Sequence, residues 1–343
     1  MRMSFLESLE PAARELLLSV ARPVSYVPTA VLVRHGEPAR GAYILRSGTV
    51  EALVTLPGGE SLVVATLGAG SVFGEMALVE LGTCTATVRA ASPVDGWFIA
   101  HEDFRALVSQ AHPAGQQLQH AVTIALAGKL AALNERLLAC RAPEDRAARP
   151  TPAADPLAGV ARQRRPPFEA LEFMPSLALF AHCDRDEVEE IAAHGSWIEC
   201  ARGQGIFSAG TDALAAYLVV RGAVEVIAAC GELERRVAVI GPGHMVGYLS
   251  VLRRARHSTS AYVRESCVLL ELRVDAFHAA YFGTTRASAR LRQAVQANLL
   301  VSMARTNRAL TRLISLEQLG RSSARDAELE AAYHSQLATA SPL

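Results

Sequence analysis

The sequence has no surplus of charge of either sign. Lys and Arg total 34, Asp and Glu also total 34, and the formal net charge at pH 7 is zero. A protein whose main partner is DNA usually carries a basic excess, so this balance argues against a DNA-binding role. Half of the 343 residues are apolar and 20% are charged, which indicates a soluble globular protein long enough for two domains.

The sequence also lacks the spacings that metal sites and redox sites require. Its cysteines form no CxxC pair and are scattered over six positions: Cys84, Cys140, Cys183, Cys200, Cys230 and Cys267. This pattern is typical of reduced thiols in a cytoplasmic protein. The ten histidines show no HxH, HxxxH or HExxH spacing, and no serine or cysteine nucleophile motif is present. We therefore predict no metal site and no catalysis.

Long apolar runs and a signal peptide are missing as well. The first 20 residues contain Glu7, Glu10, Pro11 and Glu15, which predicts an amphipathic helix and not a secretion signal. No apolar run reaches the roughly 18 residues that a membrane-spanning helix needs. We expect a cytoplasmic protein without a membrane span.

What the sequence does contain is an internal repeat. The segment GEPARGAYILRSGTVEAL at 36–53 matches GTDALAAYLVVRGAVEVI at 210–227, an offset of 174 residues. Further along, the offset becomes 173, so that LGAGSVFGE at 67–75 aligns with IGPGHMVGY at 240–248. An offset that persists over some hundred residues indicates a duplicated unit.

Each copy shows the same order of predicted elements. A short helix comes first, followed by short β-prone runs with glycines every eight to twelve residues; in the first copy these runs are 30–33, 42–45, 50–55 and 62–66. Segment 55–62 is predicted to be a hairpin turn. This spacing predicts a small antiparallel barrel. The expected fold class is α+β, mainly β, with two jelly-roll barrels, each carrying flanking helices and a long C-terminal helix.

The two long helices, predicted at 112–140 and 287–314, have apolar residues at steps of three and four. Such a stripe must be buried, either against the helix's own barrel or against another helix. Eight turns exceed the length of a small barrel, so we expect the two helices to pair. The pairing could occur within one chain, as an internal pseudo-dimer, or between two chains, as a homodimer.

The repeat defines the predicted domain boundaries. Residues 1–140 form the first domain, 168–319 the second, and 320–343 a C-terminal tail. The intervening segment 141–167 is rich in Pro, Ala and charge, which predicts a flexible linker. Its basic residues Arg162, Arg164 and Arg165 are interpreted as a solvated cluster.

Both copies resemble the cyclic nucleotide-binding domain of catabolite-activator-type bacterial regulators and of protein kinase A regulatory subunits. The family's phosphate-binding cassette has the pattern F-G-E-[LM]-A-L-x5-R-x-A-T-V-x-A. Residues 73–90, FGEMALVELGTCTATVRA, match it at every position except the arginine, where Cys84 stands. The resemblance extends over about 16–137 in the first copy and 177–314 in the second.

The resemblance implies a ligand site in the first copy. Backbone N–H groups at the start of a short helix would cradle a phosphate, and Glu75 would accept a hydrogen bond from a ribose hydroxyl. Without the arginine, a charge-assisted bond worth about 1.5–3 kcal/mol is lost, which weakens binding by roughly one to two powers of ten. The predicted site consists of Phe73, Gly74, Glu75, Met76, Ala77, Cys84, Thr85 and Asn134.

The second copy departs further from the family pattern. Tyr248 stands at the position of the ribose-binding Glu and His257 at that of the arginine. Neighbouring arginines, at 253, 254 and 256, either replace the missing cation or solvate the loop. The predicted site consists of Gly247, Tyr248, Leu249, Ser250, Arg256, His257, Ser258, Thr306 and Asn307. Asn134 and Asn307 lie in apolar stripes, where each could contact a base or set the register of paired helices.

These observations predict a non-catalytic cytoplasmic regulatory or sensor protein with two degenerate cyclic nucleotide-binding domains. It would act through contacts with a protein partner. The candidate ligands for regulating these contacts are cAMP, cGMP and cyclic di-GMP. One alternative is a ligand-independent scaffold whose domains are pseudo-sensors. A second is a receptor for a cyclic dinucleotide or another nucleotide. The segment after the second long helix is too short for a winged helix-turn-helix, so we expect no DNA binding.

Overall fold

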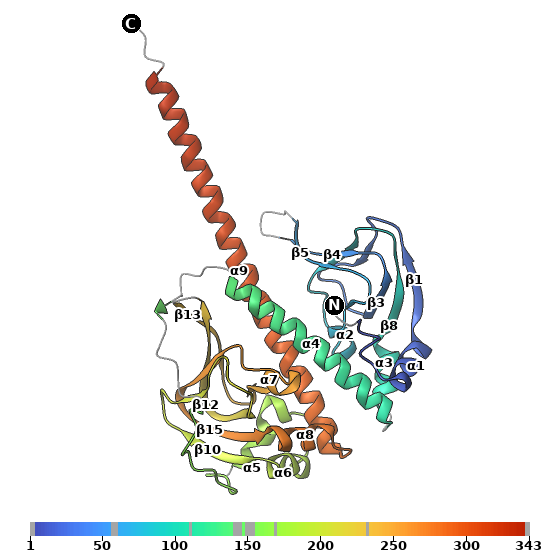
Figure 1. Ribbon diagram of the computed structural model, residues 1–343, viewed down its shortest axis with the longest axis vertical. Helices are drawn as coiled ribbons and strands as arrows, with labels where there is room; N and C mark the ends of the chain where they lie inside the picture. Colours follow the sequence, from blue (N-terminus) through green and yellow to red (C-terminus); the bar gives the residue numbers. More distant parts are fainter. Residues whose placement is uncertain are drawn as a thin grey trace.

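The computed structural model describes residues 4–55, 61–109, 112–139, 146–147, 155–167, 170–230 and 233–339, with the side chains of the last helix as far as residue 314. It contains two β-domains joined by two long helices (Figure 1). No helix within these ranges is both long and apolar enough to cross a bilayer. The central residues of the predicted 55–62 hairpin lie outside the described ranges.

The first domain is a sandwich of two four-stranded antiparallel sheets, with strand orders β1-β8-β3-β6 and β2-β7-β4-β5. Its strands are β1 (Arg22–Tyr26), β2 (Val31–Val33), β3 (Gly41–Ser47), β4 (Val50–Thr55), β5 (Ser61–Leu67), β6 (Val72–Phe73), β7 (Thr87–Ala90) and β8 (Val94–Ala100). Its helices are α1 (Pro11–Val20), α2 (Met76–Val79), α3 (His101–Ser109) and α4 (Pro113–Ala139). The predicted strand at 50–55 coincides with β4, and the predicted fold class is confirmed.

The second domain repeats this plan with longer, continuous strands. β12 pairs with β15 from Ala215↔Arg273 to Ile227↔Ser260, with register shifts, so each strand covers the length of two strands of the first domain. The strands are β9 (Arg146–Ala147), β10 (Ser196–Cys200), β11 (Gly205–Phe207), β12 (Ala215–Cys230), β13 (Leu233–Ile240), β14 (Met245–Val246) and β15 (Ser260–Arg273). The helices are α5 (Ala170–Phe173), η1 (Met174–Ser176), η2 (Ala178–Phe180), α6 (Arg185–Ala193), α7 (Tyr248–Arg253), α8 (Val274–Phe282) and α9 (Arg286–Thr339).

The repeated glycines have a shared structural reason. Gly48 and Gly222 occupy equivalent turns with left-handed φ angles of 84° and 86°. A Cβ atom would clash with the carbonyl oxygen of Pro93 at the first position and of Ser266 at the second. Only glycine combines this φ with such close approach of a neighbouring strand, which explains why the duplication keeps both residues.

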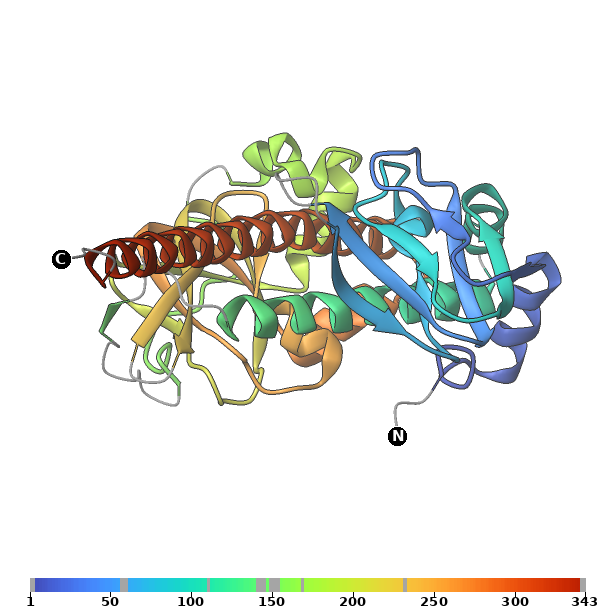
Figure 2. The same cartoon turned by 90° about the horizontal axis from the view of Figure 1, so that it is seen from above.

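The two long helices pair with each other, as the apolar stripes predict, and this pairing is within one chain. α4 and α9 lie side by side (Figures 1 and 2), and Figure 1 shows α9 continuing away from the domains. One hydrophobic core includes Leu118, Val122 and Leu126 of α4 together with Val295 and Leu299 of α9. The stripes therefore bury their apolar surface against each other as well as against the barrels.

A buried polar ladder accompanies this helix pair. Gln119 donates to Gln296 (3.3 Å), Gln296 donates to Thr123 (2.9 Å), and Arg292 donates to Gln119 (3.2 Å). Positions 119 and 292, like 123 and 296, are equivalent in the repeat, so the ladder is pseudo-symmetric. Near the end of α4, the carbonyl of Leu137 accepts a hydrogen bond from a buried guanidinium of the second domain, Arg235. These contacts set one register for the pair.

Two boundaries differ from the sequence prediction. α9, the long helix that closes the second copy, continues to Thr339, so residues 320–339 extend this closing helix instead of forming a separate tail. Within 141–167, the part at 155–167 packs on the second domain: Leu157 is 1% exposed in its core, and Arg162 forms two hydrogen bonds to buried Glu271, at 2.6 and 3.1 Å. The proline and charge content of the segment predicted a flexible linker. The ordered conformation of 155–167 could not be foreseen because Glu271, which binds Arg162, lies 109 residues away in the chain. The rest of the predicted linker, apart from β9, lies outside the described residues.

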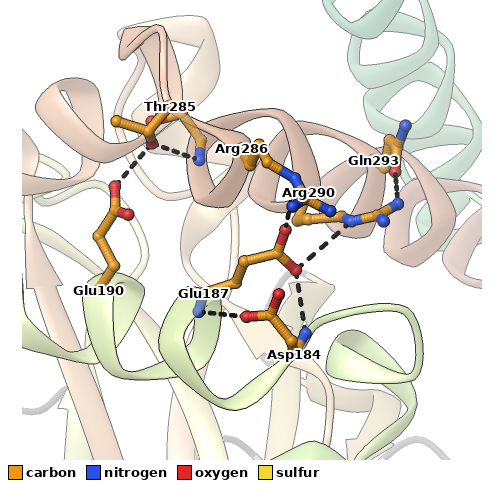
Figure 3. Close-up of polar contacts among 8 residues, drawn as sticks. Asp184, Glu187, Glu190, Thr285, Arg286, Arg290 and Gln293 are labelled. Atoms are coloured by element: carbon orange, nitrogen blue, oxygen red, sulfur yellow. Dashed lines mark hydrogen bonds and ion pairs between the residues drawn. The ribbon is translucent and has the colours of Figure 1, made fainter.

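A polar cluster anchors the start of α9 to α6 (Figure 3). Asp184 and Glu187 form a capping box, in which each side chain accepts a hydrogen bond from the other's backbone N–H, at 2.9 and 3.0 Å. The Glu187 carboxylate also lies 3.5 Å from Arg286 and 3.6 Å from Arg290 of α9. Since Glu187 is only 5% exposed, its carboxylate depends on these partners.

We therefore expect Glu187→Ala to lower the free energy of unfolding of the second domain by about 1–3 kcal/mol, because it removes the side-chain half of the capping box and the carboxylate that faces Arg286 and Arg290. Glu189→Ala is the matched control, since the ion pair that Glu189 forms among the described residues is with Arg185, on the exposed face of the same helix. Urea unfolding in a Trp97→Phe background, followed by Trp197 fluorescence, measures the difference. Equal stability of the two variants would contradict the anchoring role.

Candidate functional site

The cassette of the first copy consists of a strand, a tight bend at Gly74, the short helix that the resemblance implies, and a returning strand. β6 ends at Phe73, whose ring stacks on Tyr43 with centroids 5.0 Å apart. Gly74 follows with a φ of 75°, and a Cβ there would lie 2.7 Å from the carbonyl oxygen of Gly41. Met76 and Ala77 open α2, and Ala77 is held by a 2.5 Å contact between its carbonyl oxygen and Nδ1 of His101.

Glu75 of this cassette is already paired within the protein. Its side chain is buried, and Oε2 lies 2.5 Å from Nζ of Lys129 on α4. The same ammonium group donates to the carbonyl oxygen of Val72, at 3.0 Å. Lys129 is the only lysine in the chain. The carboxylate that the family pattern assigns to a ribose hydroxyl therefore binds a cation of the closing helix.

Cys84 supplies no positive charge to this cassette. Its backbone is held by hydrogen bonds with Gly36 (2.9 Å) and Glu37 (2.8 Å), and its side chain is half-buried. Burial, followed by the nearby Glu37 carboxylate, raises the pKa of the thiol, so it stays neutral at pH 7. Thr85 is exposed beside it.

In the second cassette, Gly247 again has a φ of 75°, but Tyr248 is buried where a carboxylate would be needed. Its hydroxyl has no hydrogen-bond partner among the described residues, and burial raises its pKa to about 12. The amide nitrogen of Asn298 on α9 is also buried and unpartnered there. Ser302 and Asn298 lie close enough to the Tyr248 hydroxyl to oppose the rise in its pKa, so a small shift of α9 would bring Tyr248 and Asn298 into hydrogen-bond contact.

His257 cannot act as the missing cation at neutral pH. Its side chain is 4% exposed and stacks on Phe207 with ring centroids 3.9 Å apart and an interplanar angle of 13°. Burial lowers its pKa to about 4, so the imidazole is neutral at pH 7. The stacked, uncharged ring fills space beside the cassette.

The arginines of the loop do not take its place. Arg256 is exposed and lies 3.1 Å from Asp212, outside the cavity beside the cassette. Arg253 and Arg254 line a different cavity, between α7, α8 and α4. Of the two interpretations of these arginines, the one in which an arginine replaces the missing cassette cation therefore has no support in the geometry.

The cavity beside the second cassette has a volume of about 110 Å³ and is bounded by the cassette, β13, α9 and α4. Among the predicted site residues, its lining includes Gly247, Tyr248, Leu249, Ser250, His257, Ser258 and Thr306. Asn307 is not among the lining residues. Asn134, predicted for the first site, lines this second cavity, and its Oδ1 accepts a hydrogen bond of 3.1 Å from Thr306. Asn134 thus links the helices and also faces the cavity of the other copy.

Two cations were missed from the sequence. Lys129 holds Glu75, and Arg305 of α9 lines the second cavity, where no ion pair to it is found among the described residues. Both interrupt the apolar stripes of the closing helices, near positions that the resemblance assigns to the base. A single Lys or Arg within an apolar stripe was the sequence signal for such a residue. The partner of Lys129 could not be inferred because Glu75 lies on a different element.

The low pKa of His257 predicts a pH dependence of stability. Below about pH 6.5 the unfolded chain binds a proton at this residue, whereas the folded chain stays neutral until about pH 4. Stability that depends on the neutral ring is therefore complete above pH 6.5 and is lost as the pH falls toward 4, with a slope of up to about 1.4 kcal/mol per pH unit.

His257→Phe keeps an aromatic ring and removes this titration, so its stability should depend less on pH between 6.5 and 4 than that of the wild type. Urea unfolding at four pH values across this window measures the difference, with exposed His35→Gln as the control. Parallel profiles for wild type and His257→Phe would show that the ring is not held neutral.

Comparison with known proteins agrees with this geometry. The cyclic nucleotide-binding domain family model matches residues 23–111 and 197–282, together just over half of the chain. Among curated relatives, the chain is 36% identical over 95 residues to an acetyltransferase, Pat, of Mycolicibacterium smegmatis, a match covering 28% of each protein. It is 33% identical over 85 residues to a cAMP-dependent protein kinase regulatory subunit of Blastocladiella emersonii, covering 25% of this chain and 21% of that one.

A third curated match has a similar extent. The cyclic AMP receptor protein of Thermus thermophilus is 30% identical over 100 residues, covering 29% of this chain and 46% of that one. All three matches span less than half of the relative's length. Among solved structures, the regulatory domain of Toxoplasma gondii PKA with cAMP matches 88% of this chain and 92% of that one, at 20% identity and a TM-score of 0.32. From the two family-model matches, one in each copy, the chain belongs to the cyclic nucleotide-binding domain family.

Proposed function

We propose that this is a non-catalytic cytoplasmic regulatory protein in which the first copy is a locked pseudo-sensor and the second copy responds to a nucleotide. The observation that carries the proposal is the ion pair between Glu75 and Lys129. A nucleotide in the first copy would have to break this pair to reach the carboxylate. It would also meet a neutral thiol at Cys84 in place of a guanidinium.

The ion pair between Glu75 and Lys129 also fixes the position of the long helix α4. Lys129 lies on α4 and binds both Glu75 and the carbonyl oxygen of Val72, so the cassette holds the helix without a ligand. A regulatory change in this family requires two positions of a closing helix with different affinity for the ligand. Because α4 is already bound to its cassette, the first copy would keep one conformation while α9 of the second copy moves.

The second copy has the features of a ligand-facing site. Arg305 provides a guanidinium in the cavity, and Ser250, Ser258 and Thr306 provide hydroxyl groups. Phosphate binding by such donors is favourable because each hydrogen bond is charge-assisted. The cavity, at about 110 Å³, is below the roughly 300 Å³ typical of ligand sites, so binding would require it to widen. Since α9 forms one wall, widening would move α9 and alter the surface that a protein partner contacts.

The names of two relatives, a cAMP-dependent kinase regulatory subunit and a cyclic AMP receptor protein, make cyclic AMP the first nucleotide to test. The small cavity favours a second candidate function. In that case the second copy is also closed, and the protein is a ligand-independent scaffold held together by the α4–α9 ladder.

Isothermal titration of the full chain with cAMP, cGMP and cyclic di-GMP distinguishes these functions. We expect one binding event per chain, weakened at least tenfold by Arg305→Gln because a charge-assisted bond is lost. Arg308→Gln, one turn further along α9 on an exposed position, is the matched control. No heat from any of the three at high micromolar concentration would favour the scaffold instead.

The same titration tests whether the ion pair between Glu75 and Lys129 prevents nucleotide binding in the first copy. Cys84→Arg alone should add no second site, because Lys129 still occupies Glu75, whereas Cys84→Arg combined with Lys129→Met should create one for cAMP. Two binding events in the unmodified chain, or loss of binding in Glu75→Gln, would show that the first copy is itself the sensor.

A further inference from the structure

A larger cavity lies apart from the one beside the second cassette, between the first copy's α4 and the second copy's α7 and α8. Its volume is about 300 Å³. Its lining side chains are of three kinds, two arginines, two histidines and three apolar residues, and none of those described is acidic. Such a mixture of apolar walls and converging polar groups is the usual composition of a small-molecule site.

The two arginines are available to an anion. Arg253 is the last residue of α7, Arg254 follows it, and both are exposed; no hydrogen bond or ion pair of either guanidinium occurs among the described residues. Arg254 has a φ of 48°, a left-handed conformation that residues other than glycine rarely adopt. Adjacent guanidiniums without a carboxylate partner favour binding of an oxyanion, because their planar forks match its geometry.

The two histidines face the same positive charge. His120 comes from α4 and His278 from α8, and Nδ1 of His120 has no hydrogen-bond partner among the described residues. Burial lowers the pKa of both imidazoles; His278 and then Arg254 lower that of His120 further, whereas for His278 the effect of Arg254 is opposed by Asp275. A bound anion would offset the repulsion and favour the protonated rings.

The remaining walls are apolar. Ile124 and Leu252 lie in the cavity with Phe282, whose side chain is 48% exposed although it is large and aromatic. The ring of Phe282 contacts those of His120 and His278 edge-on, with centroids 4.9 and 5.8 Å apart. An anion that also carries an apolar group would cover this ring.

We propose that this cavity binds a small organic oxyanion, a carboxylate or phosphate monoester that carries an aromatic or branched apolar group. Arg253 and Arg254 bind the oxyanion, and Phe282 contacts the apolar group. The ligand bridges the closing helix of the first copy and the cassette helix of the second. The site is separate from the nucleotide cavities, so it stands whether or not a nucleotide binds.

Titration calorimetry of the full chain with phenylacetate, phenyl phosphate and inorganic phosphate tests the proposal. We expect one site per chain for an organic anion, at least tenfold tighter than inorganic phosphate, and the tighter organic ligand identifies the anionic group. Phenylacetate should bind more tightly at pH 5.5 than at pH 7.5, because its charge is nearly constant over this range while the histidines gain protons.

The double variant Arg253→Gln/Arg254→Gln should weaken binding at least tenfold, and Phe282→Ser should weaken the organic anions but not inorganic phosphate. Arg256→Gln is the control, because Arg256 is an exposed arginine of the same loop that pairs with Asp212 outside the cavity. Absence of binding at millimolar concentration, unchanged affinity in the double variant, or equal affinity for inorganic phosphate would overturn the proposal.

Discussion

The buried carboxylate of Glu75 is the constraint on which the rest of the arrangement depends. A charge that is 3% exposed is strongly unfavourable without a counterion, and the family pattern places this one in a turn whose partner would be a ligand. Lys129 supplies the counterion from α4, at 2.5 Å. The cassette and the long helix α4 of the first copy are therefore joined by an ion pair within the protein itself.

This constraint extends to the second copy through the paired helices. α4 is bound to its own cassette by Lys129 and to α9 by the ladder of Gln119, Thr123 and Gln296. Asn134, one and a half turns beyond Lys129, reaches the cavity of the second copy. The duplication has thus placed in one chain a helix pair whose two members differ: α4 is bound to its own cassette, while α9 lines the cavity beside the second cassette, where Arg305 has no ion-pair partner among the described residues.

Much of this fold was predictable from the sequence, because the repeat, the strand spacing and the glycine turns are local signals. The strand at 50–55, the cassette turn at Gly74 and the pairing of the apolar stripes were all confirmed. The partners of the polar side chains were not predictable, because each lies far away in the chain: Lys129 is 54 residues from Glu75, and Arg162 is 109 residues from Glu271. For the same reason Arg256 was included in the predicted second site, whereas in the structure it pairs with Asp212 outside the cavity.

The most direct test of the account is a double-mutant cycle on Glu75 and Lys129. The variants are Glu75→Gln, Lys129→Met and the combination, and urea unfolding is followed by Trp97 fluorescence in a Trp197→Phe background. Because the carboxylate is buried but the lysine side chain is 34% exposed, the coupling free energy should be about 1–3 kcal/mol, with the double variant more stable than the sum of the single losses predicts. Additive losses, within about 0.5 kcal/mol, would show that the two groups do not hold the cassette to the closing helix.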